Sequence, residues 1–120
     1  MVVFSNQRLG PSAELLVSND VATAMLLAIA DAARPSAAAR WECELVEWLV
    51  RRAGSTADHF DVAEIAWTPE HFESQRHFLV RAIELAAISS AHAAALGRWR
   101  ALISSYPRAC VQVGRRWPPV

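Results

Sequence analysis

The feature that most constrains this chain is a run from Val21 to Ala33 that is apolar except at two positions. A surface helix presents one apolar and one polar face, so a run with no polar face is typical of a helix buried on all sides. The pair Asn19-Asp20 offers side-chain oxygens that can cap its first turn. The sequence therefore predicts a helix over 20–34 at the centre of the fold. The two polar positions are Thr23 and Asp31.

Three more segments carry helical signals. A proline at position 35 separates the first helix from a second one, in which Trp41, Leu45 and Trp48 recur on one face. Thr68 followed by Pro69 is typical of a helix start, with a hydroxyl cap and a proline at the first helical position. We expect a single all-α domain spanning 1–120, a compact bundle of helices at roughly 20–34, 36–53, 69–88 and 91–105.

An α+β fold is the alternative. Short segments near 2–4, 62–67 and 110–113 are rich in β-branched residues or alternate between apolar and polar residues, which is typical of strands. They are well separated along the chain but could pair in space. A small sheet built from these three segments would then accompany the helices.

Composition excludes several classes of protein. Of the 120 residues, 53% are hydrophobic and 20% charged, which favours a folded domain over a disordered chain. Basic and acidic residues number 12 each, so no net field recruits nucleic acid or an anionic membrane. The chain has no lysine, which excludes a Schiff-base lysine and a phosphate-binding Gly-Lys-Ser/Thr loop.

The sequence also predicts a cytoplasmic protein without a cofactor. The short apolar start at residues 1–4 does not resemble a signal peptide, and the longest apolar run is too short to span a bilayer. Two cysteines do not make a disulfide scaffold, and Cys43 falls where a helix would bury a small residue. No Gly-x-Gly-x-x-Gly loop or Gly-x-Ser-x-Gly elbow is present, so we expect no dinucleotide cofactor and name no catalytic residue.

Charge is distributed unevenly along the chain. Residues 53–75 contain acids but no arginine, and the part after Glu84 contains arginines but no acid. We expect these two segments to face each other within the fold or across a dimer. The alternative is anion or nucleic-acid binding by the basic C-terminal third, where arginines alternate with aromatic residues that can stack on bases. The arginines are Arg98, Arg100, Arg108, Arg115 and Arg116.

A second alternative is a small metal-dependent enzyme. Histidines and carboxylates are concentrated at 58–77, and this is the ligand set of zinc, iron and manganese sites. Glu73 and His77 are one helical turn apart on the expected solvent side of the helix, where such a pair is most simply a surface ion pair. The spacing matches no established metal motif, so we predict no metal. The weak candidate ligands are His59, His71, Glu73 and His77.

The leading hypothesis is a non-enzymatic helical protein-interaction module, with a homodimer as its expected form. The helix over 36–53 has two apolar faces, and the outer helix of a small domain usually buries only one. Its second face contains Cys43, Val46 and Val50. Tryptophan and arginine are enriched among the residues that dominate protein interfaces. We assign Trp41, Trp48, Arg52 and Trp117 as candidate interaction residues.

Overall fold

The computed structural model describes residues 1–6, 13–55 and 58–107, and places four α-helices close to the predicted positions. It also contains a small sheet and two short 3-10 helices. Within this described part, no helix has both the length and the apolar character needed to cross a membrane. The elements in chain order are β1 (Val2–Ser5), β2 (Glu14–Val17), α1 (Asn19–Ala33), η2 (Arg34–Ser36), α2 (Arg40–Ala53), β3 (His59–Asp61), η3 (Val62–Glu64), α3 (Phe72–Ser89) and α4 (Ala93–Ser104).

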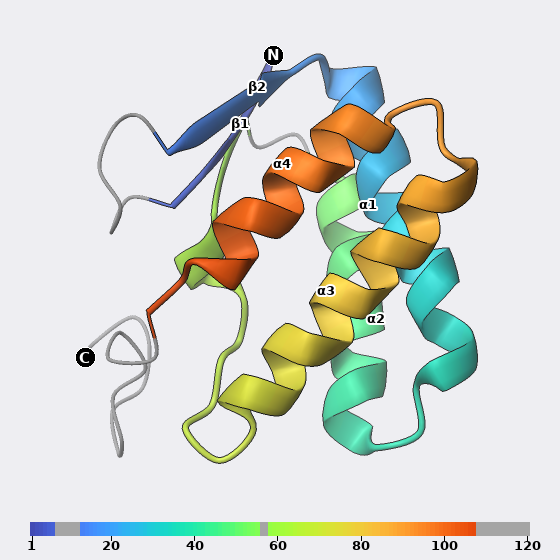
Figure 1. Ribbon diagram of the computed structural model, residues 1–120, viewed down its shortest axis with the longest axis vertical. Coiled ribbons are helices and arrows are strands. Elements are labelled where there is room, and N and C mark those ends of the chain that lie inside the picture. Colours follow the sequence, from blue (N-terminus) through green and yellow to red (C-terminus); the bar gives the residue numbers. More distant parts are fainter. Residues whose placement is uncertain (7–12, 56–57, 108–120) are drawn as a thin grey trace.

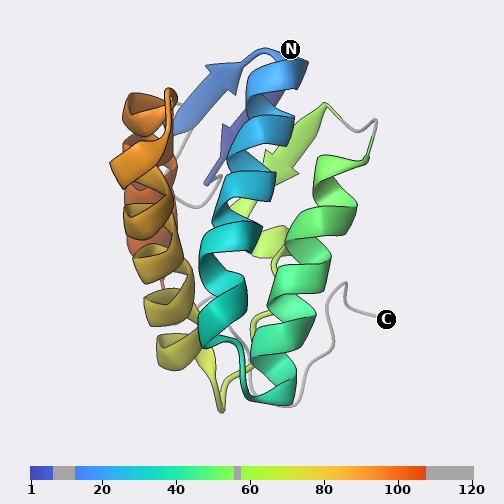
Figure 2. The same ribbon diagram turned by 90° about the vertical axis from the view of Figure 1, so that its right-hand side faces the viewer.

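Three of the helices form a row. Figure 1 shows α3 and α4 side by side, with the sheet at the end of the molecule where the chain begins. Figure 2, turned by 90°, looks onto α1 with α2 on one side and α3 on the other. In this view α2 and α3 run in the same direction and α1 runs against them. The helix predicted at the centre therefore lies in the middle of the row, but one of its sides faces outward.

The sheet adds a short layer to the helices. Its strand order is β2-β1-β3, with β1 antiparallel to β2 and parallel to β3. Phe4 on β1 is aligned with both Leu15 and Phe60 on its neighbours, and all three side chains are buried. Since side chains alternate across a sheet, these three define its inner face. The all-α prediction is thus only partly right, and the α+β alternative fits this mostly helical fold with its small sheet.

The strands differ in part from those predicted. The segment near 2–4 forms β1, whereas 110–113 lies outside the described residues and β2 was not predicted. The prediction of a strand at 62–67 is wrong, because the chain turns immediately after Asp61. The Asp61 Oδ1 atom accepts a hydrogen bond from Ala63 N–H at 2.9 Å, and the Asp61 N–H donates one to Glu64 Oε2 at 2.7 Å. These local bonds form η3, and the strand is the preceding β3.

The core is centred on aromatic rings. Trp99 on α4 is fully buried and lies 5.2 Å from the ring of Phe4 and 5.5 Å from that of Phe60. A second group forms where the loop before α3 meets the end of α4, with Trp67 stacked on Tyr106 at 5.7 Å. Offset and edge-to-face ring contacts of this kind stabilise a fold beyond the area they bury. The sheet and the 58–71 segment are thereby fixed to the helices.

The third helix starts later than predicted. Thr68 does not cap it: its Oγ1 is buried and has no hydrogen-bond partner among the described residues. The loop is instead fixed by Gln75, which accepts a hydrogen bond from Thr68 N–H at 3.0 Å and donates one to the Ala66 carbonyl at 2.9 Å. The helix begins at Phe72, because the chain first makes a turn over residues 69–71.

The first helix is capped by Ser18 rather than by the predicted pair Asn19-Asp20, which are its first two residues. Ser18 has extended backbone geometry, and its Oγ accepts a hydrogen bond from Val21 N–H at 3.3 Å. We expect Ser18→Ala to lower the free energy of unfolding by about 1 kcal/mol, because one first-turn amide loses its partner. Urea denaturation followed by circular dichroism measures this. Asn19→Ala serves as the control, and an equal loss in that variant would contradict the assignment.

Candidate interaction surface

Two of the predicted interaction residues, Trp48 and Arg52, lie on the inner side of α2 and are half-buried. Trp48 meets the ring of Phe60 edge-on at 5.0 Å. The Arg52 guanidinium lies 4.5 Å above the same ring, donates a hydrogen bond to the His59 carbonyl and is 3.4 Å from Glu64 Oε1. This side of α2 is therefore occupied by contacts to β3 and η3.

The third, Trp41, lies near the start of α2. Its ring stacks on His71 with centroids 5.5 Å apart and meets Phe78 edge-on at 5.8 Å. It is half-buried and joins α2 to the beginning of α3. Trp117, the fourth predicted residue, lies outside the described residues.

The candidate metal ligands are divided between two places. His59 is on β3, while His71, Glu73 and His77 are near the start of α3. The expected Glu73–His77 ion pair is wrong, because both oxygens of Glu73 accept hydrogen bonds from Arg76 Nη2, at 2.9 and 3.0 Å. Across the described residues no three histidine, cysteine or acidic side chains are grouped as metal ligands would be.

A polar chain that the sequence did not indicate links β1 to β3. Ser5 Oγ donates a hydrogen bond to Asp61 Oδ2 at 2.9 Å and lies 3.1 Å from His59 Nε2. The serine hydroxyl has one hydrogen, which it gives to Asp61, so His59 Nε2 must be the donor to Ser5. A nucleophilic serine needs the opposite arrangement, in which histidine accepts the proton. Ser5 is also only 1% exposed, so these hydrogen bonds join β1 to β3 and do not present an activated serine at the surface.

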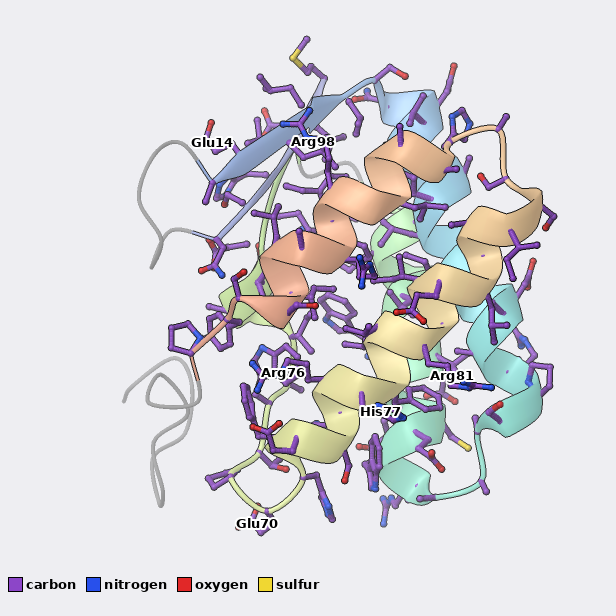
Figure 3. The ribbon with its side chains drawn as sticks, in the orientation of Figure 1. Glu14, Glu70, Arg76, His77, Arg81 and Arg98 are labelled. Carbon is purple, nitrogen blue, oxygen red and sulfur yellow. The ribbon has the colours of Figure 1, made fainter. Side chains whose placement is uncertain are left out.

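Within one molecule, the described arginines of the basic C-terminal third do not pair with the acidic segment. Arg98 donates a hydrogen bond to the Glu14 carbonyl (Figure 3). Arg100 Nη1 lies 3.4 Å from Glu84 Oε1. The acidic segment is offset instead by Arg52 and Arg76, through Glu64 and Glu73. Local partners therefore neutralise much of the charge that the sequence separates. Arg108, Arg115 and Arg116 lie outside the described residues.

The side of the molecule seen in Figure 2 is formed by α1, α2 and α3, with β3 visible farther back between α1 and α2. On α2, Cys43, Glu47 and Val50 are exposed and follow one another at helical spacing, on the side away from Trp48. Cys43 was expected to be buried, but it carries a free and exposed thiol. The second apolar face of this helix comprises Cys43, Val46 and Val50, and only Val46 is buried.

The neighbouring helices extend this exposed side. On α1, Ala24 and Leu27 are exposed, so the expectation that this helix is buried all round is wrong. On α3, Arg81 points toward the right in Figure 3, which is the side that faces the viewer in Figure 2. Leu85 and Ile88 follow Arg81 at one and two helical turns, so they lie on the same side. We define the outer helical face as Ala24, Leu27, Cys43, Glu47, Val50, Arg81, Leu85 and Ile88.

A pocket of about 460 Å³ lies where the end of α1 and the start of α2 meet α3. Its lining includes Ala32 and Ala33 of α1, Trp41 of α2, and Arg81 and Leu85 of α3. Arg81 and Leu85 belong to the outer helical face, so the pocket adjoins this face.

Two charged residues on the outer helical face have no partner among the described residues. Neither Glu47 on α2 nor Arg81 on α3 forms a hydrogen bond or an ion pair with any residue that the structure describes. They lie on opposite sides of α1, so they do not neutralise each other within one molecule. The face therefore carries a carboxylate toward its α2 edge and a guanidinium toward its α3 edge.

Comparison with known proteins gives no further guide to this site: no family model matches the chain, and neither a curated protein nor a solved structure is similar to it.

Proposed function

We propose that this protein is a non-enzymatic interaction module that forms a homodimer through its outer helical face. The observation that carries the proposal is the placement of the exposed apolar side chains. Of the six large hydrophobic residues exposed in the described part of the chain, four belong to this face. They are Leu27, Val50 and Leu85, each about two-fifths exposed, and Ile88, which is 81% exposed.

Burial of these side chains would stabilise an assembly. Removing apolar surface from water contributes roughly 25 cal/mol per Å², and apolar patches on a monomer of this size commonly mark interfaces. A helix of fifteen residues, like α1, is about 22 Å long, and three helices spaced about 9 Å apart give a face of roughly 600 Å² in projection. That is on the scale of the ~800 Å² that each partner buries in an interface of standard size.

If the protein forms a reversible homodimer, its average molecular mass in solution rises with protein concentration. We expect sedimentation velocity to show a monomer–dimer equilibrium in the micromolar range. Ile88→Glu should shift it toward monomer, because a carboxylate would replace a side chain that the partner covers. Leu16→Glu is the matched control, since Leu16 is 57% exposed on β2 and is not part of the face.

Two results would contradict the proposal. One is a wild-type chain that remains monomeric over the whole concentration range. The other is a dimer that Leu16→Glu disrupts and Ile88→Glu leaves intact, because the contact would then lie at the sheet.

A further inference from the structure

We infer that the second copy packs with a two-fold axis parallel to α1, so that Glu47 of each subunit pairs with Arg81 of its partner. This inference rests on the proposed homodimer and specifies its geometry. It concerns the two charged groups on the outer helical face that have no partner among the described residues. In such a dimer each would be satisfied by the other copy, and the contact would occur twice.

The order of the helices determines which pairs can meet. In Figure 2 the row is α3, α1, α2. A two-fold axis parallel to α1 exchanges the two edges of the facing copy, so α2 of one subunit lies opposite α3 of its partner. The Glu47 carboxylate then lies on the side of the Arg81 guanidinium of the partner. Val50 on α2 is likewise brought opposite the exposed apolar residues of α3.

An axis perpendicular to α1 within the interface gives the opposite result. It would place α2 against α2 and α3 against α3 and would also invert heights along the helices, so Glu47 could not lie opposite Arg81. Only the parallel axis brings these two opposite charges together, which favours it at the interface.

The heights of the two residues along the helices also agree. Trp41 and Phe78 are in ring contact at 5.8 Å, which provides a common reference level for α2 and α3. Both helices run in the same direction from there. At 1.5 Å per residue, Glu47 lies about 9 Å beyond this level and Arg81 about 4.5 Å beyond it. A rotation about the parallel axis preserves height, and these long side chains can span a difference of about 5 Å.

Close approach along the axis is possible because the outward side of α1 is small. Ala24 is exposed there and Ala28 is partly exposed, so two copies of α1 can lie side by side near these residues without large side chains between them. The exposed acids on this side are Asp20, which lies in the first turn where the helix dipole offsets a negative charge, and Asp31, which has Arg34 at 3.9 Å on its own chain. Asp31 does not therefore bring an isolated negative charge to the axis.

Exchange of charges tests the pairing directly. We expect Glu47→Arg and Arg81→Glu, each alone, to raise the dimer dissociation constant roughly 10- to 100-fold, because both symmetric pairs become repulsive. An equimolar mixture of the two variants should form a heterodimer, since every facing pair is then attractive. The double variant E47R/R81E should form a homodimer with about the affinity of the wild type. Sedimentation velocity of each sample, and of the mixture, measures these quantities.

The controls separate this pairing from a general effect of charge. Glu70→Arg and Arg98→Glu change charge equally at exposed sites that Figure 3 places away from the outer helical face, and should leave the dissociation constant unchanged. Glu47→Gln and Arg81→Gln give a second, milder cycle if a reversed charge prevents folding. Their double variant should weaken the dimer no more than either single one does.

The outcomes test the homodimer and the Glu47–Arg81 pairing separately. A monomeric wild type would overturn both the homodimer and the pairing. A wild-type dimer that both single reversals leave unchanged, or that the mixture does not restore, would retain the homodimer and overturn the Glu47–Arg81 pairing.

Discussion

Trp99→Ala is expected to lower the free energy of unfolding by about 3–5 kcal/mol, the largest effect of any single change considered for this protein. The side chain is fully buried and its ring lies against Phe4 and Phe60, so truncation leaves a cavity where the sheet meets α4. A loss of this size is a large part of the about 5–15 kcal/mol that stabilises a typical domain. Urea denaturation followed by far-ultraviolet circular dichroism measures it.

Two further variants make this prediction specific. Trp41→Ala removes an indole that is only half-buried, so we expect a smaller loss of stability. Trp99→Phe retains a ring and removes Nε1, which is buried and has no acceptor among the described residues, so its cost should lie well below that of Trp99→Ala. If Trp41→Ala were more destabilising than Trp99→Ala, the centre of the core would lie at α2 and not at α4.

Gln75→Leu is expected to lower the free energy of unfolding by about 2–3 kcal/mol, although leucine is the more hydrophobic residue. The Gln75 side chain is almost completely buried and forms the two hydrogen bonds that fix the loop before α3. Leucine would leave Thr68 N–H and the Ala66 carbonyl without this partner. Amide hydrogen exchange should therefore accelerate at Thr68 in addition to the loss measured in urea.

Ser74→Ala is the control for Gln75, because Ser74 is adjacent in the sequence but exposed. We expect this change to alter stability by no more than about 0.5 kcal/mol. Unchanged protection of the Thr68 amide in Gln75→Leu would mean that the glutamine does not hold the loop.

The positions of the helices were predictable because their signals are local. Apolar residues at helical spacing and prolines between the segments placed all four within a few residues of their observed bounds. The error at the start of the first helix arises because several neighbouring residues can cap a helix, whereas the third helix starts late because the chain first turns over residues 69–71. Ser18, Asn19 and Asp20 are all good caps, and only the observed backbone geometry selects Ser18.

The sheet was harder to predict because its strands are short and their pairing is non-local. Ser5 and Asp61 are 56 residues apart in the chain, yet they are joined by a hydrogen bond between β1 and β3. Alternation over three or four residues occurs in many segments that form no strand, as at 62–67. A short strand is stabilised by its neighbours, so its own residues carry little information about it.

The exposed surface of α2 could also be predicted only in part. The two apolar faces of α2 were visible in the sequence, but not which of them is covered. The side with Trp48 and Arg52 packs on Phe60, because the segment after α2 returns along it as β3. The side with Cys43 and Val50 is left exposed. Periodicity identifies faces, and the path of distant segments decides which face remains for a partner.

The sequence by itself determined where the helices lie, that the chain has an apolar core and that its net charge is zero, since these follow from local spacing and composition. Only the tertiary structure decided that α1 has an outward side and that Arg76 rather than His77 pairs with Glu73. It also decided that Glu47 and Arg81 remain without partners in the described part of the chain. The physical reason is that a charged side chain has many possible partners along the sequence, and packing brings only a few of them within reach.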